Sequence, residues 1–175
     1  MLSLMLLCQS MWGQESRREI ASPVTPADSK ANDKNVPEVR TIPTQFERVV
    51  LLRFKYDTEL LSGLEKAVQE NKIRNGVILG AYGSVRNYHV HQVSNRSMPP
   101  KNMFVKDPTG PADILSMSGM ILNGRVHPHI TLANPDEAMG GHLEPGTNVF
   151  TFCVVTIGVL PDGLDLGRLD DKDWR

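Results

Sequence analysis

The chain has 175 residues, a net charge of −1 and two cysteines, Cys8 and Cys153. This length suits one globular domain with tails, and two cysteines exclude a disulfide framework. Because the charges nearly balance and Lys and Arg form no run, the composition offers no basic track for a nucleic-acid backbone.

Residues 1–13 form an apolar leader that resembles part of a secretory signal. Its hydrophobic block, Leu2–Leu7, is far too short to span a bilayer. Cleavage after a small residue such as Gly13 fits a signal peptide, but no Lys or Arg precedes the block. Two locations therefore stay open: an exported or periplasmic protein with a truncated signal, and a cytoplasmic protein with an unstructured leader.

Two further segments lie outside the predicted domain. Residues 14–45 carry four prolines among small and polar residues. Such a stretch buries too little apolar surface to offset its ordering entropy, which predicts a disordered linker. Residues 167–175 are predicted to form a solvated acidic tail, since the five aspartates after Pro161 fit no EF-hand spacing.

Residues 46–166 show the pattern of a folded domain. The segment Leu60–Val68 has apolar residues at helical spacing, with Asp57 or Thr58 as the expected N-cap. A polar loop is predicted over 94–111. The expected strands are Arg48–Phe54, Gly76–Gly83, Val85–Val93, Ile114–Asn123, Val126–Ala133 and Asn148–Leu160. One main helix with six to seven strands predicts an α+β fold with a mostly antiparallel sheet.

Three histidines in the run GRVHPHITLANPDEAMGGHL form the candidate site. His127 and His129 are two residues apart, so on a strand both imidazoles point to the same side. The turn residues 134–136 and the glycines 140–141 allow the chain to bring His142 back to this pair. Three imidazoles with a free fourth position are the ligand set of an open zinc site. The alternative is an ordinary half-exposed pair of strand histidines.

Other polar residues leave the chemistry of this site open. Glu144 is predicted to share a face with His142, as an acid, a base or a partner of a ligand, or else as a surface carboxylate. His89 and His91 share a strand face and either add polar groups to the pocket or face solvent. Cys153 is the candidate fourth ligand of a closed structural site, although its apolar surroundings favour a buried, inert thiol. No catalytic residue is assigned.

The motifs GVILGAYGSVRNYHVHQ, DILSMSGMI, GRVHPHITLA and GGHLEPGTNVFTF together resemble the PPC domain family (plants and prokaryotes conserved), in its stand-alone prokaryotic type. The resemblance implies a curved, partly barrel-like antiparallel sheet with a helix, and assembly as a homotrimer. It also implies that His127, His129 and His142 bind Zn²⁺. No AT-hook is present in the sequence, so a DNA-binding role would rest on the family resemblance alone.

Two functions from different classes follow. The first is a zinc-binding homotrimeric module that meets a protein partner or a small-molecule ligand, with nucleic acid disfavoured by the near-neutral charge. The second is a zinc-dependent lyase or hydrolase, because the H-x-H pair followed by a third histidine is similar to the site of acetolactate decarboxylase. A third possibility is a structural site, in which zinc only stabilises the hairpin that carries the three histidines and takes part in no reaction.

Overall fold

The computed structural model describes residues 14–171, so the apolar leader 1–13 with Cys8 and the last four residues of the acidic tail lie outside the described part. The elements in chain order are β1 (Ser16–Ala21), η1 (Pro26–Ser29), β2 (Arg48–Phe54), α1 (Leu60–Glu70), β3 (Asn75–Val93), β4 (Lys101–Asp107), β5 (Ala112–Leu122), β6 (Arg125–Ala133), β7 (Ala138–Leu143) and β8 (Asn148–Leu160). The predicted α+β class with a mostly antiparallel sheet and one main helix is confirmed, with eight strands among the described residues. Within residues 14–171, no helix combines the length and the apolar character that crossing a membrane requires.

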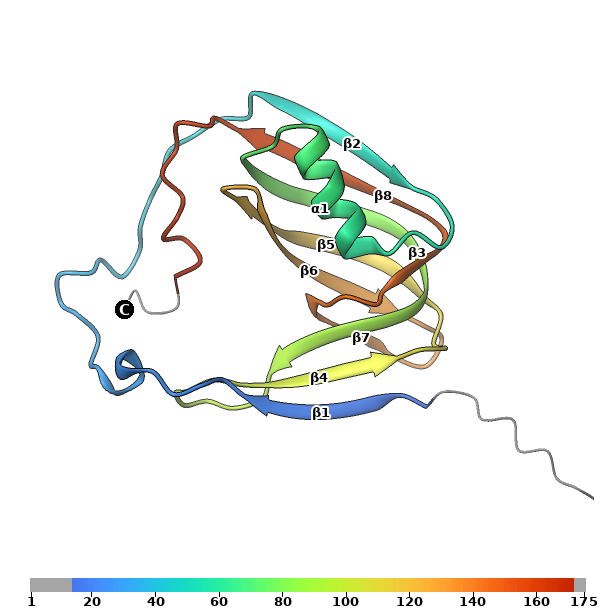
Figure 1. The fold of residues 1–175 in the computed structure, drawn as a ribbon, viewed down its shortest axis with the longest axis horizontal. Helices are drawn as coiled ribbons and strands as arrows, with labels where there is room; N and C mark the ends of the chain where they lie inside the picture. Colours follow the sequence, from blue (N-terminus) through green and yellow to red (C-terminus); the bar gives the residue numbers. More distant parts are fainter. Residues whose placement is uncertain (1–13, 172–175) are drawn as a thin grey trace, which may run out of the picture.

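The strands form one antiparallel sheet that curls back on itself (Figure 1). Its main path runs β1-β4-β3-β5-β6-β7, and β8 joins β2 to β3. Because β3 also pairs with β7, the four strands β3, β5, β6 and β7 close a ring. The long strand β3 merges the two strands predicted over 76–83 and 85–93, and it exchanges partners along its length.

Helix α1 packs its apolar stripe against the inner side of the sheet. Leu60, Leu64 and Val68 are buried at helical spacing and join one core cluster with the inward-facing residues of the strands. The N-cap is Glu59, whose carboxylate accepts backbone hydrogen bonds from the first turn. The predicted caps Asp57 and Thr58 lie in the preceding turn instead, where the backbone of Asp57 has a φ of 62°.

Two strands occupy segments for which the sequence predicted no regular structure. β4 lies within the predicted loop 94–111, and β1 lies within the predicted linker 14–45 and pairs with β4 along its whole length. All six residues of β1 are exposed, so backbone hydrogen bonds rather than a buried face hold it. A strand of this kind leaves no alternating apolar pattern in the sequence.

Candidate metal centre

Neighbouring strands bring four imidazoles into one group on the outer side of the sheet. His129 lies opposite His142 across β6 and β7, and His142 lies opposite His91 across β7 and β3. His127 precedes His129 by two residues and shares its side of β6, whereas the intervening Pro128 is buried. The three histidines predicted to meet therefore do lie together, with His91 beside them.

The turn between β6 and β7 forms as its residues predict. The side-chain oxygen of Asn134 accepts hydrogen bonds from the backbone N–H groups of Asp136 and Glu137, both at 2.9 Å. The sequence predicted that Gly140 and Gly141 would help the chain to reverse. This prediction was wrong, because both glycines lie inside β7. A Cβ at Gly140 or Gly141 would overlap a backbone carbonyl of the neighbouring strand, so only glycine lets β7 pack this closely between β6 and β3.

The geometry of His127, His129 and His142 fits a metal ion. Each ring offers one nitrogen such that the three atoms lie within 4.8 Å of one another. The Nε2 atoms of His127 and His129 are 3.3 Å apart, and tetrahedral zinc with its usual Zn–N bonds places ligand nitrogens roughly 3.3–3.4 Å apart. One pair thus already has the separation that tetrahedral zinc requires, and the ligand atom of His142 lies within 4.8 Å of both.

The pKa values of two of these histidines lie below the usual imidazole range. Burial is the largest cause for both His129 and His142, and the nearby rings of His127 and His91 lower the pKa further. The pKa of His142 falls to about 4. Both rings are therefore neutral near pH 7, and a neutral ring offers its lone pair without first losing a proton.

Cys153 does not contribute to this site. Cys153 is fully buried in the main core cluster, and burial raises the pKa of its thiol to about 12. Within residues 14–171, the histidine group contains no cysteine or carboxylate as a fourth ligand. Such a group matches an open site better than a closed structural one, in which four protein ligands are the rule.

A carboxylate–imidazole pair borders the triad. The Oε1 atom of Glu144 lies 2.6 Å from Nδ1 of His91, and both side chains are only about one-fifth exposed (20% and 23%). The ring centroid of His91 is 4.8 Å from that of His142. Glu144 thus has a defined partner beside the site. His89 lies on the same side of β3 as His91, since both rings contact Phe104, but its Nδ1 atom is 2.9 Å from the carbonyl of Pro145 and it is not part of the triad.

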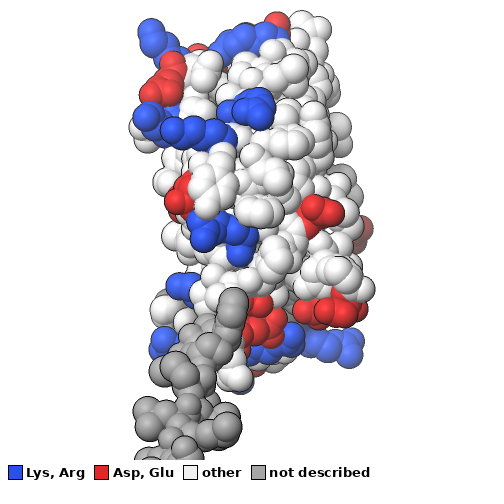
Figure 2. Space-filling view, turned by 90° about the vertical axis from the view of Figure 1, so that its right-hand side faces the viewer, with Lys and Arg blue, Asp and Glu red and all other residues white. Residues whose placement is uncertain are grey.

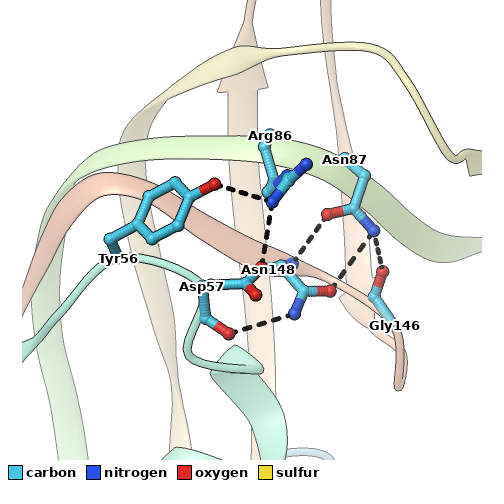
Figure 3. Close-up of polar contacts among 6 residues, drawn as sticks. All are labelled: Tyr56, Asp57, Arg86, Asn87, Gly146 and Asn148. Carbon is cyan, nitrogen blue, oxygen red and sulfur yellow. Dashed lines mark hydrogen bonds and ion pairs between the residues drawn. The ribbon is translucent and has the colours of Figure 1, made fainter.

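The loop that carries Glu144 is fastened on its far side by a polar network (Figure 3). Asn87 donates to the carbonyl of Gly146 at 2.7 Å and exchanges hydrogen bonds with Asn148. Arg86 holds the turn before α1 by donating to Tyr56 and Asp57, at 2.9 and 3.2 Å. The contacts of Asn87 tie the chain just after Glu144 to β3, the strand that also carries His91.

One contact to the triad comes from a segment that the sequence did not distinguish. Asp170, in the predicted solvated tail, lies with Oδ2 2.8 Å from Nδ1 of His127. Five aspartates follow Pro161, and nothing in their spacing separates this one from the others. Leu169 and Asp170 also line a pocket of about 160 Å³ beside His127 and His129.

The fold and these motifs agree with a comparison to known families. The family model of the Plants and Prokaryotes Conserved (PCC) domain, also abbreviated PPC, matches residues 42–161. The chain belongs to this family. The resemblance noted in the sequence motifs is thereby confirmed, and both β1 and Asp170 lie outside the matched residues.

Solved structures of similar proteins share the PCC fold. A hypothetical protein from Salmonella cholerae-suis is 26% identical, with a TM-score of 0.58 over 70% of this chain and 83% of that one. The metal-containing protein AF0104 from Archaeoglobus fulgidus is 25% identical, with a TM-score of 0.58 over 70% and 86%. A PPC protein from Pyrococcus horikoshii is 21% identical, also with a TM-score of 0.58, over 73% and 87%.

Among curated proteins, the bifunctional protein GlmU of a Synechococcus strain is 28% identical over 125 residues. The match covers 71% of this chain but only 18% of that protein. The PCC-domain chain thus spans less than a fifth of the length of this relative.

Proposed function

We propose that this PCC-domain protein is a zinc-binding module that assembles as a homotrimer and presents its metal centre to a protein partner or a small-molecule ligand. The observation that carries the proposal is the 3.3 Å separation of the His127 and His129 Nε2 atoms, with His142 beside them. The Archaeoglobus protein of the same fold, which is described as metal-containing, supports it.

Zn²⁺ would be held by the three imidazoles of the triad. Nitrogen ligands of this kind also suit nickel, copper and iron, so the comparison of metals is part of the test. When bound with a free fourth position, zinc acts as a Lewis acid that polarises a carbonyl or a water molecule. His129 and His142 supply neutral ligands near pH 7, because burial keeps their pKa values low.

Assembly as a homotrimer is supported by large apolar side chains that remain exposed on the sheet. Leu51 on β2, Tyr82 on β3 and Leu115 on β5 are 70%, 58% and 57% exposed, and β2, β8, β3 and β5 are successive neighbours in the sheet. A depression of about 570 Å³ lies beside Leu115 and Phe150. Soluble monomers rarely expose wide contiguous apolar areas. We therefore propose that two further copies of the chain bury these side chains in the subunit interfaces of the trimer.

Duplex DNA is not the proposed partner. The net charge is −1, and the face in Figure 2 has a broad uncharged area, with basic and acidic groups intermixed around it and no continuous basic surface. Binding to DNA needs several phosphate contacts that release counterions. Salt-dependent binding to a DNA duplex at physiological ionic strength would overturn this part of the proposal.

Metal analysis and zinc titration test the proposed centre. The purified protein is expected to bind one zinc per chain, and His129→Ala is expected to lose it. His89→Ala is the matched control, because it removes an imidazole of β3 that faces Pro145 instead of the triad. Equimolar zinc retained by His129→Ala would disprove the ligand assignment.

A zinc-dependent lyase or hydrolase is the second candidate. It is favoured by the pocket of about 160 Å³ beside His127 and His129, and by the Glu144–His91 pair at 2.6 Å. Metal-loaded protein is to be assayed for 2-keto acid decarboxylation and ester hydrolysis, with His129→Ala as the blank. Turnover that is present in the wild type and lost in His129→Ala would favour the enzyme over the binding module. Equal background rates in both proteins would reject these two activities.

A further inference from the structure

The segment that follows β8 runs past the end of the sheet (Figure 1, red) and is anchored there by side-chain contacts. Asn75 is fully buried, and its side-chain amide donates to the carbonyls of Pro161 and Leu164, both at 3.3 Å. Leu166 is only 2% exposed and packs with Leu122 and Leu160 in a second apolar cluster. A buried amide and a buried leucine thus anchor the stretch that leads directly into the tail 167–175, which was predicted to be solvated.

This path ends at the histidine triad. The backbone N–H of Leu169 bonds to the carbonyl of Leu166 at 3.0 Å, which turns the chain just before Asp170. The Oδ2 atom of Asp170 then lies 2.8 Å from Nδ1 of His127 and 2.6 Å from Nη2 of Arg125. Its side chain is 21% exposed. Arg125, two residues before His127 on β6, holds the carboxylate beside the ring.

The contact with Asp170 determines which nitrogen of His127 carries the proton and which has a free lone pair for a metal. A neutral imidazole carries its proton on one nitrogen, and a carboxylate at Nδ1 keeps the proton there. The free lone pair is then on Nε2, the atom that lies 3.3 Å from Nε2 of His129. The same hydrogen bond limits rotation of the ring, so the lone pair keeps its direction toward the triad.

We propose that Asp170 is a positioning residue of the metal centre: it fixes the tautomer and the orientation of His127. This inference rests on the proposed zinc site and adds to it a group from outside residues 42–161, the part of the chain that the family model covers. The segment after β8 is accordingly part of the centre, and its last described residues close one side of the adjoining pocket.

The test compares three variants of the full chain by zinc competition against a chromophoric chelator. Asp170→Ala is expected to raise the zinc dissociation constant 10–100-fold, the usual effect of removing a group that orients a ligand. Asp170→Asn retains an oxygen that accepts from Nδ1–H and is expected to recover part of the loss. Asp162→Ala removes the same charge from the exposed turn after β8 and is expected to change nothing.

A second measurement separates positioning from folding and from metal binding itself. In metal-free protein, ¹⁵N spectra of the histidine side chains are expected to show His127 as the Nδ1–H tautomer, and Asp170→Ala is expected to give a mixture of tautomers. Unchanged zinc affinity and an unchanged tautomer in Asp170→Ala, with zinc still bound by the wild type, overturn the inference and leave the zinc site standing. Failure of the wild-type protein to bind zinc overturns both.

Discussion

Gly119 gives the sharpest way to disturb the candidate centre without touching a histidine. It lies on β5 opposite Pro128, with a φ of 143°, between the positions that face His127 and His129. A Cβ at this position would overlap the carbonyl oxygen of His127, far inside the 3.0 Å that real Cβ contacts respect. In Gly119→Ala, β6 must therefore move away from β5 by most of an ångström.

The size of the effect follows from two terms. A non-glycine residue in this backbone region costs about 1–3 kcal/mol, and overpacking against β6 costs about 1–3 kcal/mol more. Metal sites tolerate ligand displacements of only about 0.2 Å. Binding of the ion requires the histidines to return to their original positions, which restores part of this strain. If that part is about 1.4 kcal/mol, the zinc dissociation constant rises tenfold. We expect at least a tenfold loss of zinc affinity.

Urea unfolding and zinc competition on the same protein samples measure both terms. Gly124→Ala is the matched control, since Gly124 also has a positive φ, of 81°, but a Cβ there meets nothing within 4 Å. The control is expected to lose about 1–2 kcal/mol of stability and to keep its zinc affinity. A folded Gly119→Ala protein that binds zinc as tightly as the wild type would refute the reasoning.

Two further predictions concern assembly and the helix. Leu51→Asp places a charge on the exposed apolar face of β2, so light scattering is expected to show that the trimer dissociates. The control is Val24→Asp, at a position that is 77% exposed, which is expected to leave the trimer intact. A Leu51→Asp protein that is still trimeric would contradict the proposed interface. Glu59→Gln weakens the N-cap of α1 and is expected to cost about 1 kcal/mol. Burial raises the pKa of Glu59, but hydrogen bonds from Ser62, Gly146 and Leu61 outweigh it and lower the pKa overall. The stability that the carboxylate adds is therefore present at neutral pH and is lost as the pH falls through that lowered pKa; a pH-independent difference in urea unfolding contradicts this assignment.

The sequence predicts the centre of the fold well because its patterns there are strong. The alternation of His127, Pro128 and His129 puts both imidazoles on one side, and the Asn134 turn forms with the hydrogen bonds that its side chain favours. The helix was also predicted from its apolar spacing. Its N-cap was not, because Glu59 is an uncommon cap that competes in the sequence with Asp57 and Thr58.

The missed features depend on contacts that no local pattern records. Strand β1 is held by backbone pairing with β4 and has no buried face, so its sequence looks like that of a linker. Asp170 reaches His127 because contacts of Asn75 and Leu166 anchor the stretch of chain that leads from β8 to Asp170. Both features are long-range and polar, and both lie outside the residues that define the family.

The location of the metal tests the central claim most directly. Crystals of the zinc-loaded protein, measured on both sides of the zinc absorption edge, are expected to show one anomalous peak per chain. The account predicts this peak at bonding distance, about 2.0–2.1 Å, from Nε2 of His127 and from a nitrogen of His129 and of His142. A peak at any other site, or none in protein that is saturated with zinc, would contradict it.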